Sequence, residues 1–135
     1  MAKFSRRSKD ILSTCDDRLQ VLFNEVVKYY DCSILCGFRN KNDQNDLYLK
    51  NLSKLQWPDS KHNMKPSLAV DVVPYFAEKP HVRWDDYRTF IHFGGFVRGV
   101  ASQMRIGIKW GGDWDCDFDM KDQTFIDYPH FEIIH

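Results

Sequence analysis

The sequence predicts an α+β domain in which a small, mostly antiparallel sheet packs with about three helices. Three observations support this class. Helical and strand-like segments alternate along the chain, no internal repeat or linker divides it, and 43% of its 135 residues are hydrophobic. Because this length suits one domain with a real core, we expect residues 1–135 to form a single unit.

Each of the three expected helices begins at a polar residue that can cap its first turn. The first starts at residues 13–14, ends near Tyr30 and carries an apolar stripe. The second starts at Asn40, and the third runs from residues 85–86 to about Arg105. The spacing of apolar residues therefore accounts for most of the helical content.

Short apolar runs predict the strands, at residues 32–38, 68–73, 106–110 and 130–134. A long loop is expected between the first two of these runs, after the second helix. Residues 113–119 alternate acidic and apolar side chains, which predicts an edge strand with an acidic outer face. A calcium loop is the alternative there, but it lacks the Gly and the bidentate Glu of such loops.

Charge and targeting signals exclude several classes of protein. Nineteen basic residues balance nineteen acidic ones, so no global field favours nucleic acid. No apolar run is long enough to span a membrane, and the polar residues 1–10 contain no secretory signal. We expect residues 1–10 to form a flexible arm, and the four cysteines to be free thiols in a reducing compartment.

Three residues stand out as candidate metal ligands. Asp71 is the one charge in an apolar run, where a carboxylate must be paired, hydrogen-bonded or bound to a metal. His62 lies nine residues before it in a loop, and His130 begins the last apolar run. Two histidines and a carboxylate are a catalytic zinc set that leaves a fourth position for water. Structural roles for both histidines, and pairing of Asp71 with Arg39, stay open as alternatives.

A carboxylate near such a site can take a proton from zinc-activated water and return it to the leaving amine. Asp127, three residues before His130, is the natural candidate.

A known family has the same residues in the same order. The zinc L-alanyl-D-glutamate peptidases that bacteriophages use as endolysins resemble this chain in the motifs Ser60-x-His62, Ala69-x-Asp71 and Asp127-x-x-His130-x-Glu132. They belong to the wider family of D-alanyl-D-alanine carboxypeptidases and vancomycin-resistance dipeptidases. The resemblance spans about residues 37–134 and includes Gly37-Phe38-Arg39, Gln44-x-x-Leu47-Tyr48, Val72-Val73-Pro74-Tyr75 and Trp110-Gly111-Gly112-Asp113-Trp114.

The resemblance implies a role for each matching residue. One Zn²⁺ would be held by His62, Asp71 and His130, with Asp127 as the catalytic carboxylate. Arg39 would steady the substrate carbonyl and the developing oxyanion. The weaker candidates are Ser60 and Gln44 for substrate binding, and Glu132 either as a partner of His130 or as a surface carboxylate.

Two departures from the family pattern concern this site. His62 and Asp71 are nine residues apart instead of seven, and Ser67 stands where the family has Gly. The dipeptidases commonly have Glu where this chain has Asp127, so Asp127 favours the endolysin branch.

The resemblance implies a monomer that hydrolyses the L-Ala–D-Glu bond of the peptidoglycan stem peptide. It would accumulate in the host bacterial cytoplasm and reach the wall after release by a holin, causing lysis. Two alternatives stay open. The same site could act as a D-Ala–D-Ala carboxypeptidase or dipeptidase, or the chain could be a non-catalytic zinc-containing binding module.

Overall fold

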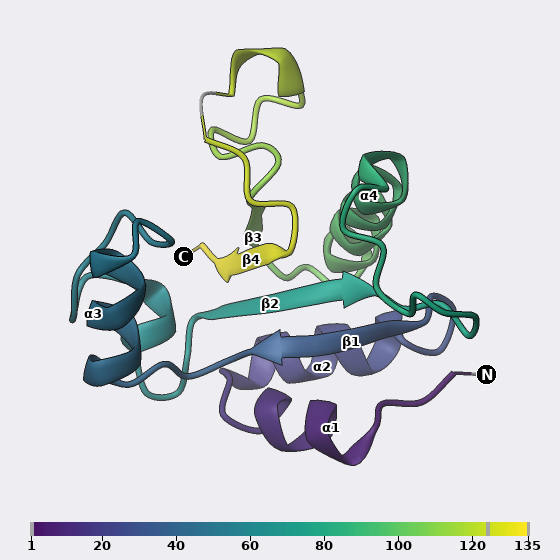
Figure 1. The fold of residues 1–135 in the computed structure, drawn as a ribbon. Helices are drawn as coiled ribbons and strands as arrows, with labels where there is room; N and C mark the ends of the chain where they lie inside the picture. The colour runs from purple at the N-terminus through teal and green to yellow at the C-terminus, as the bar shows by residue number, and fades with distance from the viewer. Residues whose placement is uncertain (1, 124, 135) are drawn as a thin grey trace.

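Four antiparallel strands form one sheet in the computed structural model, which describes residues 2–123 and 125–134 (Figure 1). The strand order is β1-β2-β4-β3. The strands are β1 (Cys32–Cys36), β2 (Ala69–Pro74), β3 (Ile108–Trp110) and β4 (His130–Ile133). The prediction of an α+β domain with a small antiparallel sheet is confirmed.

Four α-helices and two short 3-10 helices accompany the sheet. They are α1 (Arg6–Leu12), α2 (Asp17–Val26), α3 (Lys41–Leu49) and α4 (Tyr87–Gln103), with η1 (Lys61–Asn63) and η2 (Met120–Asp122). Asn40 caps α3 and Asp86 caps α4, as predicted. Within the described ranges, no helix has both the length and the apolar character to cross a bilayer.

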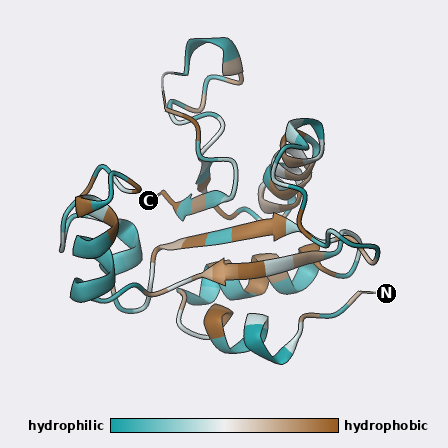
Figure 2. Ribbon diagram, viewed as in Figure 1, coloured by the Kyte–Doolittle hydropathy of each residue, from teal (hydrophilic) through white to brown (hydrophobic). Residues whose placement is uncertain are grey.

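Successive side chains of a strand point to opposite faces, and the two faces of this sheet have different surroundings. Val70 and Val72 of β2 lie on the core face beside Phe131 of β4. Phe131 packs edge-on against Phe23 of α2 and Phe93 of α4. The core therefore occupies the face under α2 and α4, and residue 71 points away from it. Figure 2 shows β2 as mostly hydrophobic ribbon with a hydrophilic interruption, whereas α3 is largely hydrophilic.

Most of residues 1–10, for which the sequence predicts a flexible arm, pack on β1. Ser8 and Leu12 are buried at a spacing of four residues, which places them on one face of α1, and Phe4, which precedes the helix, is buried too. Ser5 caps the helix, and the Ser8 hydroxyl accepts a hydrogen bond from the backbone N–H of Ile34 at 3.0 Å. This apolar face contacts β1, so a segment that is polar in composition is part of the fold.

The first predicted helix is shorter than expected at both ends. Its cap is Asp16 rather than residue 13 or 14. The backbone of Thr14 and Asp16 hydrogen-bonds to that of Ser67, at 2.9 and 2.8 Å. Since the Thr14 carbonyl oxygen pairs with this distant loop, it cannot accept a helical hydrogen bond, and the helix begins only after Asp16.

The predicted edge strand at residues 113–119 is also wrong. Cys116 and Phe118 adopt φ values of 58° and 64°, which a continuous strand cannot contain. Asp113 is buried and accepts hydrogen bonds from Arg98 Nη2 at 3.0 Å and from the Phe118 N–H at 2.9 Å. Oxygens of Asp113, Asp115 and Asp117 lie within 4.8 Å of one another.

Candidate active site

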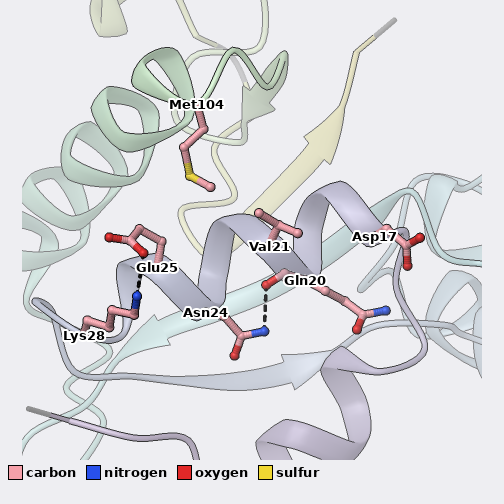
Figure 3. A pocket seen from close by; sticks show the side chains of 7 residues that line it. All are labelled: Asp17, Gln20, Val21, Asn24, Glu25, Lys28 and Met104. Atoms are coloured by element: carbon pink, nitrogen blue, oxygen red, sulfur yellow. Dashed lines mark hydrogen bonds and ion pairs between the residues drawn. The ribbon is translucent and has the colours of Figure 1, made fainter.

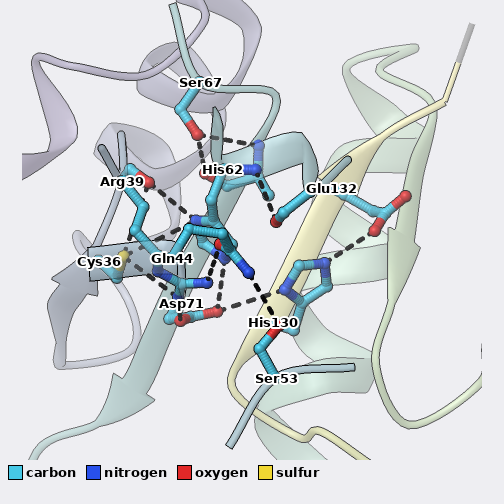
Figure 4. Close-up of polar contacts among 12 residues, drawn as sticks. Cys36, Arg39, Gln44, Ser53, His62, Ser67, Asp71, His130 and Glu132 are labelled. Carbon is cyan, nitrogen blue, oxygen red and sulfur yellow. Dashed lines mark hydrogen bonds and ion pairs between the residues drawn. The ribbon is translucent and has the colours of Figure 1, made fainter. Parts of the chain in front are cut away.

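Three predicted ligands meet on the face of the sheet that is turned away from the core (Figure 4). Asp71 and His130 are directly paired across β2 and β4, and η1 brings His62 against them. Oδ1 of Asp71 lies 3.3 Å from Nε2 of His62 and 3.4 Å from Nδ1 of His130. Residues that are separated by up to 68 positions thus converge on one point.

The remaining nitrogen of each histidine is engaged elsewhere, and this orients the ring. Nδ1 of His62 lies 2.8 Å from the carbonyl oxygen of Gly37, so it must carry the hydrogen. Nε2 of His130 lies 2.8 Å from Oε1 of Glu132 and donates to that carboxylate. Both rings therefore direct their other nitrogen, Nε2 of His62 and Nδ1 of His130, at Asp71.

Glu132 is itself held in place. Lys61 Nζ lies 3.0 Å from its Oε2 and donates to the Ile133 carbonyl oxygen at 2.7 Å. Glu132 was predicted either as a partner of His130 or as a surface carboxylate. The structure places it directly behind His130.

The donor set fits a zinc ion. Within the described part of the chain, Nε2 of His62 and Oδ1 of Asp71 are buried without a hydrogen-bond partner. A tetrahedral zinc at ordinary bond lengths keeps N and O ligands about 3.3 Å apart. The observed separations of 3.3 and 3.4 Å match this value. We therefore infer that these atoms would hold a metal.

The pKa values of Asp71 and His62 are shifted by the same close contacts. Burial alone would raise the pKa of Asp71, but the neighbouring imidazoles of His130 and His62 outweigh it and hold that pKa far below its usual range. Burial would lower the pKa of His62, yet Asp71 and Cys36 raise it to about 10. The imidazoles of His62 and His130 therefore bind protons more readily in the metal-free protein, and metal binding must release these protons.

Asp127 approaches the same point from the loop before β4. Its backbone N–H donates to Gly111 at 2.9 Å, and its carbonyl oxygen accepts from the His130 N–H at 3.0 Å. Carboxylate oxygens of Asp127 and Asp71 and a ring nitrogen of His130 lie within 4.8 Å of one another. Burial, and then the charge of Asp71, raises the pKa of Asp127, so this group binds protons more readily than an exposed aspartate does.

Arg39 completes the polar centre. Its Nη2 lies 3.6 Å from Oδ2 of Asp71, and its backbone N–H donates to the carbonyl oxygen of His62 at 2.8 Å. Nη1 donates to Oε1 of Gln44 at 3.0 Å. A fixed guanidinium therefore lies beside the candidate metal ligands.

Gln44 and Ser60, the two predicted substrate-binding residues, have different positions. Gln44 is 0% exposed and lies behind Arg39, so it cannot contact a substrate directly. Its Nε2 donates to the Leu55 carbonyl oxygen at 2.6 Å and to Ser53 Oγ at 2.9 Å. Ser60 lines the cleft but also caps η1, accepting from the His62 N–H at 3.2 Å. Gln44 is thus placed as a support for Arg39.

The sequence did not single out Cys36, although its thiol lies at the site. Sγ of Cys36 is 3.8 Å from Nδ1 of His62 and 3.6 Å from Nη2 of Arg39. An irregularity in the β1–β2 pairing after Ile34 sets Cys36 opposite Asp71. The position of Cys36 at the site follows from the strand register, which no sequence motif around Cys36 indicates.

A cleft of about 550 Å³ opens over these residues. The ring centroids of Trp114 and His130 are 5.1 Å apart, and Phe125 stacks on Trp114 with a centroid separation of 5.9 Å. The lining includes the predicted ligands, Asp127 and Arg39, and the segment 52–55 beyond α3. The cleft thus combines an apolar wall with a polar floor, as ligand sites commonly do.

A second hollow of about 570 Å³ lies between α2 and the end of α4 (Figure 3). Its polar side chains pair locally, as Lys28 does with Glu25 at 2.9 Å and Asn24 does with the Gln20 carbonyl oxygen at 2.9 Å. It brings together no histidine or cysteine among the described residues that line it. The chemistry is therefore concentrated in the cleft at the sheet.

Comparison with known proteins agrees with this fold. The structure is similar to the crystal structure of Serratia marcescens L-Ala D-Glu endopeptidase ChiX, with a TM-score of 0.78 and 24% sequence identity. The match covers 98% of this chain and 90% of that chain. At this identity the likeness establishes the shared fold. No curated protein sequence matches the chain significantly.

The family assignment rests on the whole sequence. The family model described as phage L-alanyl-D-glutamate peptidase matches residues 1–134. This agrees with the resemblance seen in the His62, Asp71 and His130 motifs. The chain belongs to the phage L-alanyl-D-glutamate peptidase family.

Proposed function

We propose that this peptidase is a zinc-dependent endolysin that hydrolyses the L-Ala–D-Glu bond of the peptidoglycan stem peptide. The observation that carries the proposal is that His62 Nε2 and His130 Nδ1 lie 3.3 and 3.4 Å from Asp71 Oδ1, the spacing of neighbouring ligands on one zinc ion. Family membership supports the choice of bond. The similar fold of an L-Ala D-Glu endopeptidase agrees with it.

The three ligands would hold one Zn²⁺ and leave a position for water. When bound, zinc supplies Lewis acidity, which polarises a carbonyl group and acidifies water. Glu132 and the Gly37 carbonyl keep the two imidazole rings in the orientation that this binding needs.

Asp127 would act as general base and then as general acid. Its carboxylate accepts the proton of the attacking water and returns it to the nitrogen of the leaving D-glutamate. The position of Asp127 suits this exchange, because its carboxylate lies within 4.8 Å of ligand atoms of Asp71 and His130.

Arg39 would stabilise the negative charge that develops on the substrate carbonyl oxygen. Gln44 holds the guanidinium in advance, through the hydrogen bond from Nη1 at 3.0 Å. Since the cation is already fixed, little reorganisation is required as the charge develops.

The biological setting belongs to the same proposal. A monomer would accumulate in the host bacterial cytoplasm and reach the wall when a holin opens the inner membrane. Its substrate would be the stem peptide, and its action would lyse the host.

Turbidity clearing of outer-membrane-permeabilised bacteria tests the proposal. The zinc-loaded protein should clear the suspension, whereas Asp127→Ala should keep its zinc and lose about 10²- to 10⁴-fold in rate. Asp10→Ala, an exposed aspartate of α1, is the matched control and should behave as wild type.

Identification of the released termini decides which bond is cut. New L-Ala carboxyl termini and D-Glu amino termini support the endopeptidase. Release of D-Ala alone would replace it with a carboxypeptidase, and bound zinc without any hydrolysis would favour a binding module.

A further inference from the structure

Three lysine and arginine side chains line the cleft, and two of them are already paired. Arg39 lies beside Asp71 and is bound to Gln44. Lys61 is bound to Glu132 and to a backbone carbonyl oxygen. Among residues 2–123 and 125–134, Lys54 has no carboxylate within ion-pair distance. It is therefore the cation of this cleft that is free to receive an anion.

The position of Lys54 is set by its neighbours. Ser53 and Leu55, on either side of it, both accept hydrogen bonds from Gln44 Nε2. The same glutamine accepts from Arg39 Nη1, so one buried side chain ties the backbone around Lys54 to the arginine of the active centre.

The Lys54 side chain reaches the aromatic wall formed by Trp114 and Phe125. Its Nζ lies 4.6 Å from the centroid of the Phe125 ring. A cation over an aromatic face keeps N–H groups available for a second partner. The ammonium group therefore lies at the aromatic wall of the cleft with N–H groups available for an anion.

The substrate of the proposed reaction brings an anion to this place. In the stem peptide D-glutamate continues the chain through its γ-carboxyl, so its α-carboxylate is free. That carboxylate is attached to the carbon that bears the nitrogen of the scissile bond. Asp59, Asp127 and Glu132 also line the cleft and would repel this carboxylate unless a cation compensated for it.

We propose that Lys54 binds the free α-carboxylate of D-glutamate and makes the enzyme specific for it over the α-carboxamide of D-isoglutamine. This inference rests on the proposed function and assigns to Lys54 the recognition of the D-glutamate residue, which contains the leaving nitrogen. Lys54 acts in substrate selection, whereas the chemistry stays with Asp127 and Arg39.

The test compares two synthetic stem peptides that differ in one group, L-Ala-γ-D-Glu-diaminopimelate and its D-isoglutamine counterpart. Wild type should prefer the carboxylate peptide. Lys54→Met removes the charge and keeps a long apolar side chain, and it should raise the KM for the carboxylate peptide about tenfold with kcat nearly unchanged. The carboxamide peptide should be cleaved by both proteins at similar rates, and Lys54→Arg should restore the preference.

Lys50→Met is the matched control, because Lys50 is exposed near the same segment and does not line the cleft. It should keep the wild-type preference. Zinc content and melting temperature of each variant confirm that the fold is intact.

Calorimetry with zinc-loaded Asp127→Ala separates this inference from the proposed function, since binding is then measured without turnover. A preference for the carboxylate peptide that disappears in Asp127→Ala/Lys54→Met supports the role of Lys54. If the preference persists without Lys54, or if both peptides weaken equally, the inference is wrong. Absence of hydrolysis by wild type would overturn the proposed function, and the calorimetric comparison would still decide the role of Lys54.

Discussion

Among the described residues, Glu132 forms no hydrogen bond or ion pair with Asp71 or His62, yet it orients His130. Its carboxylate accepts from Nε2 at 2.8 Å, which leaves Nδ1 directed at Asp71. Two hydrogen-bonded neighbours, His130 and Lys61, hold the pKa of Glu132 down to about 2 against the effect of burial. The group is therefore ionised across the working range of pH.

Replacing Glu132 with Gln should weaken zinc binding about 10- to 100-fold, because the imidazole loses the charge that orients it and strengthens it as a donor. Competition with a chelator of known zinc affinity measures the change. Glu78→Gln, an exposed carboxylate away from the cleft, should leave the affinity unchanged. Equal affinities for Glu132→Gln and wild type would show that the contact has no such role.

Asp127 should titrate abnormally in the zinc-free protein. Burial disfavours its charged form and the Asp71 charge adds to this, so its pKa should exceed the value of about 3.9 of an exposed Asp. Because a nearby dication favours the ionised form, zinc should lower this pKa, and the carboxylate should then stay ionised to lower pH. Carbon-13 NMR titration with and without zinc, assigned with Asp127→Asn, measures both steps. An unshifted pKa in the zinc-free protein would contradict the environment described above.

At the scale of elements, the loop before β4 is positioned by its contact with Gly111. The backbone of Gly111 exchanges hydrogen bonds with Asp127 and His130, each at 2.8–2.9 Å. A Cβ at position 111 would collide with the carbonyl oxygen of Asp127, which belongs to the backbone and cannot turn aside. Glycine is needed there because two backbones approach closely.

Gly111→Ala should displace Asp127 and lower kcat about 10²-fold, since even a small misplacement of a catalytic group is costly. Its melting temperature should also fall. Gly95→Ala is the matched control, because a Cβ at that position on α4 would meet nothing within 4 Å. That variant should keep full activity and gain about 0.5–1 kcal/mol from better helix propensity. Activity measurements and thermal melts of both variants test this. Wild-type activity of Gly111→Ala would show that position 111 does not set the position of Asp127.

At the scale of the whole molecule, the sheet separates stability from chemistry. One face carries Phe131 and Val72 into the core, and the other carries His130 and Asp71 to the cleft. The ligands come from η1, β2 and β4, so an ion bound there would connect segments that are distant along the chain. The native state would therefore gain stability from the metal, since the unfolded chain has no such site.

Removal of zinc should lower the melting temperature by several degrees. A free zinc concentration of 100 times the Kd stabilises the native state by about 2.7 kcal/mol. Differential scanning calorimetry of chelated and reloaded protein measures the shift. Asp71→Asn should show a much smaller zinc-dependent shift, because the central ligand has lost its charge. Identical melting of chelated and loaded wild type would contradict a metal at this site.

Most elements and the candidate site could be predicted because their signals are local or carried by motifs. Asn40 and Asp86 cap their helices where expected, and the apolar run around Asp71 forms the central strand. The errors fall where a local pattern suits two structures. Alternation of acidic and apolar residues fits a strand, but burial of Asp113 against Arg98 of α4 turns that segment into a loop.

The sequence by itself determined the fold class, the family and the set of side chains that could hold a metal, since periodicity, caps and motif spacing are properties of neighbours along the chain. Only the tertiary structure decided that α1 is part of the domain, that Gln44 supports Arg39 from behind, that Cys36 lies beside His62 and Arg39, and that Lys54 lines the cleft. These outcomes depend on strand register and on packing between distant segments. Such contacts are set by the burial and hydrogen bonding of the whole chain, so no local stretch of sequence contains them.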